Sequence, residues 1–469
     1  MCGRSRYRCY LDVARAALVI KYILIARRAQ MKSEHLKNLL LAQIGSVSNR
    51  FKEFSVDPNK HFTRKRKLPF EKIIKTVIGM ESKSLTNELI DAFSSDTDLP
   101  STSAFVQQRC KIKPDAFKTI FDGFTAEIIN ETSSDIRILA VDGSDIQIAT
   151  NPEDLSSYHP GANGQKPYNL LHLNALYDLE NHIYADAVVQ GRRDCNEHDA
   201  LQKMVDSSGI PKALVIADRG YESYNNMAHI QEKGWYFLIR IKDGVNGIKN
   251  GLSLPDSKEF DIDISLKLSR KQTNEMKELY LKEKNHYKFI PHSAQFDFLD
   301  TKLRKRDPIH FYELHFRIVR FKISDDLYET VLTNLNSSEY KPDKLKTLYA
   351  ARWGIETSFR DLKYTIGLLD FHSKKVMCIY QEIYARLIMY NFAEMITSHV
   401  AIKKKQRKYT YKANFSIAVH MCRLFYQDKT TSPCLEAIIA QNLVPVRPGR
   451  HKERNLTPKI YHGFLYRVA

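Results

Sequence analysis

The stretch IRILAVDGSDIQI, residues 136–148, predicts the fold class of this chain. Its first half, from Ile136 to Val141, is apolar except for Arg137 and has the length of a buried strand, and the Asp142–Gly143 pair then predicts a turn. Strands that are apolar on both faces are typical of sheets covered by helices on two sides. We therefore expect an α/β core that begins here.

Strand-like and helix-like segments alternate downstream of this stretch. In chain order they are a strand pair over 168–190 with DLEN as its turn, a helix over 196–208, the buried strand ALVIADRGY over 213–221, a helix over 223–233 and the strand WYFLIRI over 235–241. This order predicts a mixed sheet flanked by helices. We assign it to a core over residues 131–241.

Residues 242–331 interrupt the alternation. Polar loops come first, and the β-patterned runs HFYELHFRIVRFKI and DLYETVLTNL follow. We interpret the segment as a β-rich insertion that returns to the core. The core then resumes over 332–400, with a long helix starting near Pro342 and a second helix over 379–400.

The region over 31–130 has a mainly helical pattern. It carries the basic run HFTRKRK at 61–67 and a short helix, capped near Ser101, that contains Gln107, Gln108 and Arg109. Short capped helices beside basic runs suit contacts with DNA, so we expect a helical DNA-binding region here. Helical bundles that bind no ligand share this pattern.

Both ends of the chain differ from its middle. Residues 1–30 change character at Met31, where a better-patterned helix opens. A non-native leader and a genuine N-terminal helix both fit residues 1–30. At the other end, residues 401–469 contain AIKKKQRKYTYK and VRPGRHKERNLTPK, which predict a basic helical region.

Composition narrows the choice of partner. The chain of 469 residues has 72 Lys and Arg against 54 Asp and Glu, a net charge of +18, so nucleic acid is the expected partner. Its seven cysteines are scattered without Cys-x-x-Cys pairs, which predicts reduced cytosolic thiols and no structural zinc site. No run of about 18 uncharged apolar residues predicts a membrane span.

Two carboxylates, Asp142 and Asp218, follow buried runs. In α/β sheets the ends of strands are where functional side chains gather, and two carboxylates there can share a metal ion. Each also fits a purely structural role, because Asp and Gly both favour turns. Taken one at a time, the structural reading is the stronger.

A third element is more specific. The segment KTLYAARWGIETSFRDLKYTIGL, residues 346–368, holds Tyr349, Arg352, Glu356 and Lys363. At about 100° per residue these four fall within an arc of about 60° on one helix. One acid, two cations and a phenol form a good site for metal and phosphate together, although an exposed helix face with ion pairs is the plain alternative. Gly354 in mid-helix indicates close approach by another backbone or by a ligand.

Together, the VDGSD and ADRGY motifs and the spacing Tyr-x2-Arg-x3-Glu-x6-Lys resemble the bacterial insertion-sequence transposases of family four. These are DDE transposases with an RNase H-like catalytic core. The resemblance covers about 135–400 and implies a metal-binding triad of Asp142, Asp218 and Glu356. It also implies that Tyr349, Arg352 and Lys363 contact DNA phosphates. Asp145, three residues after Asp142, does not match the family motif.

The chemistry implied is two-metal phosphodiester cleavage with Mg²⁺, for which Mn²⁺ can substitute. Water would cut at the element's end, and the freed 3′-OH would attack a second strand. The resemblance further implies double-stranded DNA, both element ends and target, as substrate, a homodimer on that DNA, and action in the bacterial cytoplasm at the nucleoid. An RNase H-like nuclease and a DNA-binding protein without catalysis are the alternatives. We interpret His172, His182 and His198 as structural.

Overall fold

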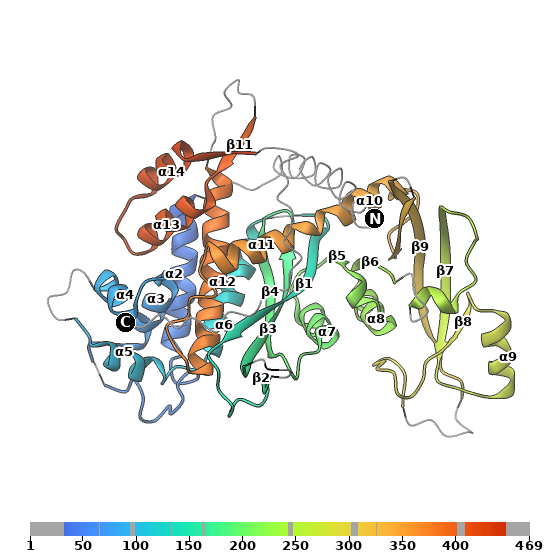
Figure 1. The fold of residues 1–469 in the computed structure, drawn as a ribbon, viewed down its shortest axis with the longest axis horizontal. Coiled ribbons are helices and arrows are strands. Elements are labelled where there is room, and N and C mark those ends of the chain that lie inside the picture. The colour runs from blue at the N-terminus through green and yellow to red at the C-terminus, as the bar shows by residue number, and fades with distance from the viewer. Residues whose placement is uncertain are drawn as a thin grey trace.

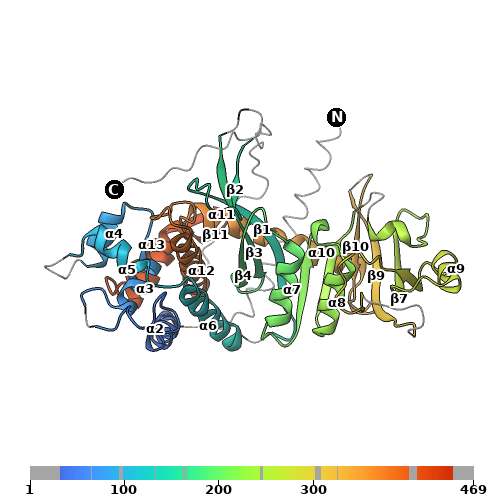
Figure 2. The same cartoon turned by 90° about the horizontal axis from the view of Figure 1, so that it is seen from below.

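The computed structural model describes residues 32–446, apart from 65, 94–98, 133, 162–163, 165, 243–246, 302–307, 325 and 401–408. Three parts follow one another along the longest axis (Figures 1 and 2). Helices from both ends of the chain lie at one end, a mixed sheet lies in the middle, and the segment after β6 extends the other end. The expected leader over 1–30 and the basic stretch at the end of the chain lie outside the described residues.

The central sheet has the arrangement expected of an RNase H-like core. Its strands are β1 (Arg137–Ile148), β2 (Tyr158–His159), β3 (Tyr168–Asp178), β4 (Ile183–Gly191), β5 (Ala213–Ala217) and β6 (Tyr236–Arg240). Strand β1 is central. On one side it pairs with β3, which is antiparallel to it, and β3 pairs antiparallel with β4. On the other side β1 pairs with β5, and β5 with β6, both in parallel. The predicted fold class is therefore confirmed.

Helices cover both faces of this sheet, as the apolar strands require. Alternate residues of β1 enter two separate hydrophobic clusters, because successive side chains of a strand point to opposite faces. Leu139 and Val141 pack with α7 (Glu197–Ser207) and α8 (Tyr224–Glu232). Ala140 packs on the other face with α6 (Asp115–Glu131), α11 (Trp353–Tyr364) and α12 (Val376–His399).

The β-rich insertion continues the core sheet. Its elements are β7 (Phe260–Ser269), α9 (Asn274–Lys282), β8 (Tyr287–Phe289), β9 (Tyr312–Ser324) and β10 (Leu327–Thr333). Strand β10 pairs with β6, so one sheet runs from the core into the insertion. The expected boundary between residues 331 and 332 falls inside β10 and is wrong. Backbone hydrogen bonds between β10 and β6 leave no break at that position.

The N-terminal helices pack against the C-terminal ones. They are α2 (Ser33–Asn49), α3 (Phe70–Gly79), α4 (Leu85–Ala92), α5 (Thr102–Arg109) and α6 (Asp115–Glu131). Helices α2, α3 and α6 contact α12 (Val376–His399), and α13 (Phe415–Tyr426) packs on α12 and α14 (Ser432–Gln441). The helical pattern expected over 31–130 is present, and Ser101 caps α5 by accepting a hydrogen bond from the Ala104 amide. No helix of the described ranges is long and apolar enough to span a membrane.

Arg109, which we expected on a DNA-contacting helix, is only 2% exposed. Its guanidinium donates to Gln381 Oε1 at 2.7 Å, to Glu382 Oε1 at 2.9 Å and to the Cys378 carbonyl oxygen at 2.6 Å. The expectation is wrong for this residue, because three partners on α12 occupy its donors. Arg109 instead ties α5 to α12.

The C-terminal region contains strands as well as helices. Strands β11 (Thr410–Ala413) and β12 (Leu443–Val446) form an antiparallel pair around α13 and α14. An entirely helical interpretation of 401–469 is therefore wrong over the described part. The two strands are far apart in sequence, and each is too short to give a pattern by itself.

Candidate active site

Asp142 lies within a strand and not at its end. Strand β1 continues through Asp142 and Gly143, which lie opposite Ala175 and Asn174 of β3. The predicted turn is wrong, and the glycine has another role. A Cβ atom at Gly143 would lie 2.2 Å from Nε2 of His172, so the glycine leaves room for an imidazole that crosses the strand.

Asp218 comes directly after β5, as predicted. Strands β1 and β5 are parallel, with Ala140 beside Ile216. Continuing this register by two residues brings Asp142 beside Asp218. Ala140 and Ile216 both belong to the cluster that includes Ile355 of α11 (Trp353–Tyr364), so the two acids share the face that α11 covers.

Glu356 is supplied by α11, which packs across β1. The predicted single helix is two helices, because α10 (Pro342–Ala351) ends before Arg352 and α11 begins after it. At the junction, the backbone N–H of Arg352 donates to the carbonyl oxygen of Tyr349, and the N–H of Ile355 donates to the carbonyl oxygen of Arg352, both at 3.1 Å. Gly354 lies at this junction, where a Cβ atom would meet Leu179 Cδ2 at 2.8 Å. A close approach at this glycine is present, but a side chain makes it, so the expected backbone or ligand is wrong.

Arg352 joins two of the three acids. Its Nη2 donates to Oε1 of Glu356 at 2.7 Å, and its Nη1 lies 3.7 Å from Oδ2 of Asp142. Burial raises the pKa of Asp142 to about 6, although Arg352 opposes this rise, and the charges of Glu356 and Asp218 add to it. The three carboxylates are thus close enough to repel one another in a partly buried setting. A cation would relieve that repulsion.

The two other residues of the spacing motif lie beside this centre. Tyr349 is on α10 and buried, its hydroxyl has no hydrogen-bond partner in the part of the chain that the structure describes, and burial raises its pKa to about 12. Lys363, on α11, donates to the backbone oxygen of Asp145 at 2.7 Å. Burial lowers the pKa of Lys363, although the Asp145 carboxylate opposes this. Arg352 and Lys363 thus contact β1, Glu356 pairs with Arg352, and Tyr349 is close enough to Arg352 and Asp218 to interact with their charges.

The donor set of the three acids fits hard divalent cations. Carboxylate oxygens are the ligands that Mg²⁺ and Mn²⁺ prefer. The ligand atoms of the three acids are not gathered as tightly as in a filled site. Among the described residues, the one group of three such side chains with ligand atoms within 4.8 Å of one another is His172, Cys195 and Glu197.

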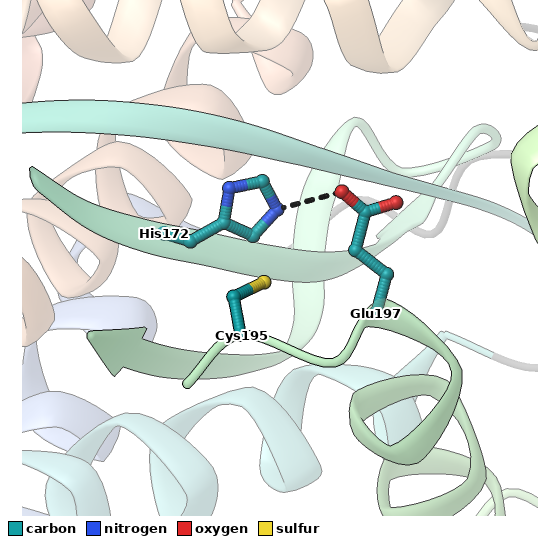
Figure 3. Close-up of side chains that lie close together, drawn as sticks. All are labelled: His172, Cys195 and Glu197. Carbon is teal, nitrogen blue, oxygen red and sulfur yellow. Dashed lines mark ion pairs between the residues drawn. The ribbon is translucent and has the colours of Figure 1, made fainter. Parts of the chain in front are cut away.

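Sequence reasoning missed this second group (Figure 3). Nδ1 of His172 donates to Asp145 Oδ1 at 2.6 Å, and its Nε2 lies 3.2 Å from Glu197 Oε1. The group could have been found only from the register of the sheet, because Asp145 of β1 lies directly opposite His172 of β3. Of the other two histidines, His198 bonds Asn226 at 2.7 Å, and His182 follows the turn with a φ of 58°.

Comparisons with known proteins agree with the sequence motifs. A family model described as "Transposase DDE domain" matches residues 133–392, more than half of the chain. The chain is 21% identical over 347 residues to the transposase InsG for insertion sequence element IS4 of Escherichia coli, covering 70% of each protein. It is also 21% identical over 313 residues to the transposase for insertion sequence element IS231E of Bacillus thuringiensis, covering 62% of this chain and 63% of that protein.

A solved structure is also similar. It is a cryo-EM structure of the piggyBac transposase synaptic complex with hairpin DNA, at a TM-score of 0.43 and 13% identity. The match covers 92% of this chain and 89% of that one.

Proposed function

Because the chain belongs to the family of transposases with a DDE domain, we propose that Asp142, Asp218 and Glu356 are its catalytic triad and hold two Mg²⁺ ions. The chain is a DNA transposase and therefore acts on DNA, and the chemistry of its family depends on divalent metal ions. Mn²⁺ has the same preference for oxygen ligands and should substitute. When bound, such ions activate the attacking oxygen and stabilise the leaving one.

One observation carries this assignment. Three carboxylates from β1, the end of β5 and α11 share one face of the sheet, and a single guanidinium contacts two of them. A structural ion pair needs one acid for one base. Burial and the charges of Glu356 and Asp218 raise the pKa of Asp142, so this arrangement of three acids costs stability without a cation, which is a common property of functional sites.

The proposed reaction has two steps. Water attacks the phosphodiester at the element's end, its oxygen bonds to phosphorus, and the bond to the 3′ oxygen breaks. The freed 3′-OH next attacks a target phosphodiester and displaces the target's own 3′ oxygen.

Three side chains contact the DNA in this proposal. The guanidinium of Arg352 offers a planar fork to phosphate oxygens, and the ammonium group of Lys363 offers a point charge. The buried Tyr349 hydroxyl has no hydrogen-bond partner among the described residues, and we propose that it donates to DNA.

We further propose that the N-terminal helices contact the element ends. Arg64 and Arg66 are exposed in the basic run ahead of α3. Basic side chains supply most non-specific DNA affinity and position the duplex. The R64A/R66A variant should bind DNA more weakly, whereas K277A/K284A, a basic pair in and after α9 of the insertion, should not change end binding. Equal binding by both variants would remove the basic run from the interface.

Two further parts of the proposal concern assembly and place. A transposase must bring two element ends together, so we infer that it acts as a homodimer on DNA. Because its substrate is chromosomal DNA, we infer that it acts at the bacterial nucleoid. Light scattering on a complex with element ends, compared with protein alone, tests the dimer.

A cleavage and joining assay tests the triad. Its substrate is the DNA beside the coding region, where short inverted repeats should mark the ends. Asp142→Asn, Asp218→Asn and Glu356→Gln should abolish Mg²⁺-dependent cleavage and keep end binding. Asp343→Asn, at an exposed acid of α10, is the matched control and should cleave normally. Full cleavage by any triad variant removes that residue from the site, and cleavage without joining by the wild type would indicate a nuclease.

A further inference from the structure

We propose that His172, Cys195 and Glu197 bind one divalent cation of the zinc class, at a site separate from the catalytic triad. Their ligand atoms lie within 4.8 Å of one another. Imidazole nitrogen, thiolate sulfur and carboxylate oxygen together are a ligand set typical of Zn²⁺. Three protein ligands leave a fourth position for water.

The histidine is prepared for this role. A carboxylate only accepts hydrogen bonds, so Nδ1 of His172 must donate to Asp145 at 2.6 Å. In the neutral ring, Nε2 then carries the free lone pair. Within the described residues this atom is buried and lies 3.2 Å from Oε1 of Glu197, without the geometry of a regular hydrogen bond. A histidine held by a carboxylate through its other nitrogen is the usual arrangement at protein zinc sites.

The three ligands come from three elements (Figure 3). His172 is on β3, Cys195 is in the loop after β4, and Glu197 is the first residue of α7. The sulfur of Cys195 points toward the imidazole. A bound cation would therefore connect the start of α7 to the sheet, which predicts a role in stability.

The charges around the group balance with a divalent ion. Asp145, Glu197 and a Cys195 thiolate carry three negative charges, and Arg192, 3.1 Å from Asp145, carries one positive charge. A divalent cation makes the sum zero. Without metal, a doubly protonated His172 and a neutral thiol give the same sum, so an imidazolium held between two carboxylates is the competing arrangement.

This group is distinct from the catalytic acids. Asp145 and His172 face the side of the sheet that packs on α7, whereas Asp142 faces α11. The softer ligands also separate the two sites chemically, because Mg²⁺ avoids thiolate. The inference therefore stands or falls independently of the triad.

Cobalt substitution tests it on the full chain. Metal-free protein should take up one equivalent of Co²⁺ and develop a thiolate-to-cobalt charge-transfer band, which Zn²⁺ abolishes and excess Mg²⁺ does not. Cys195→Ser should lack the band, whereas Cys434→Ser, at an exposed cysteine on α14, should keep it. Glu356→Gln should keep the band and lose cleavage, which separates this site from the triad. No band in the wild type, or a band that survives in Cys195→Ser, would overturn the proposal.

Two measurements guard against a variant that fails to fold. Asp145→Asn retains all three ligands and should keep the band with an affinity about 10- to 100-fold lower, the usual effect of losing a carboxylate behind a histidine ligand. In the wild type, Zn²⁺ should protect Cys195 from alkylation, as read by peptide mapping, and Mg²⁺ should not. Equal alkylation with and without Zn²⁺ would contradict the site.

Discussion

Arg352 and Glu356 form an ion pair one helical turn apart, with Nη2 2.7 Å from Oε1. The same guanidinium lies 3.7 Å from Asp142. In this position the arginine partly neutralises two acids when no metal ion is present. If cations took over that role, as we propose, the donors of Arg352 would become available to the phosphate of a DNA end.

Arg352→Lys should therefore lower cleavage by about 100-fold, because an ammonium group keeps the charge but lacks the bidentate fork. The melting temperature should change little, since the ion pair with Glu356 can re-form. Arg360→Lys, at an exposed position of the same helix, is the control. Normal cleavage and joining by Arg352→Lys would exclude the phosphate role.

Lys363→Met should weaken binding of the element ends while its side chain still packs along β1. Its ammonium group donates to the Asp145 carbonyl oxygen, so its charge lies on β1, three residues along the strand from Asp142. If it also contacts a phosphate, the slope of log affinity against log salt should fall by about 1. An unchanged slope together with a lower melting temperature would show that Lys363 only supports the fold.

Gly143→Ala should destabilise the chain by about 1–3 kcal/mol, the usual cost of inserting a methyl group where there is no room. The new Cβ atom would lie 2.2 Å from Nε2 of His172. In a His172→Ala background the same change should cost much less, which a double-mutant cycle in urea measures. Gly209→Ala is the matched control, because nothing lies within 4 Å of its added Cβ. Additive costs would contradict this contact.

Glu382→Gln should lower the free energy of unfolding by about 3–5 kcal/mol at neutral pH, because it breaks a buried ion pair. Burial alone would raise the pKa of Glu382, but Arg109, His372 and Arg386 together lower it to about 2. A lowered pKa means that the stabilisation is complete above the unfolded value of about 4.3 and is lost as the pH falls toward 2.

Urea unfolding at several pH values checks this prediction. The difference between wild type and Glu382→Gln should shrink between pH values of about 4 and 2. Glu278→Gln changes an exposed glutamate of α9 and should show no such trend. A difference that does not depend on pH would mean that the charge of Glu382 does not stabilise the fold.

The sequence predicts local elements of this chain well. The strands at 168–190, 213–221 and 235–241 and the helix near Pro342 are present, because apolar periodicity and turn residues are local signals. The Asp142–Gly143 pair gave a false turn. Glycine is present there because a side chain would collide with His172 on the neighbouring strand. This contact between distant residues cannot be read from a local sequence pattern.

Long-range contacts explain the remaining differences. Arg109 has the pattern of an exposed basic residue, yet its partners lie about 270 positions away on α12. The group at His172 depends on the pairing of β1 with β3 and on the placement of α7. At the candidate active site, the spacing of Tyr349, Arg352, Glu356 and Lys363 was informative because three of them lie on two consecutive helices and Arg352 lies at the junction between these helices.

The buried contacts of Arg109 have a consequence for engineering this enzyme. Helices α2, α3 and α6 share one hydrophobic core with α12, and Arg109 adds an ion pair inside it. The proposed end-recognition helices therefore cannot be grafted as a cassette between related elements without exposing apolar surface on both sides of the cut. Retargeting this enzyme to new ends calls for substitutions at exposed positions, with the interior left as it is.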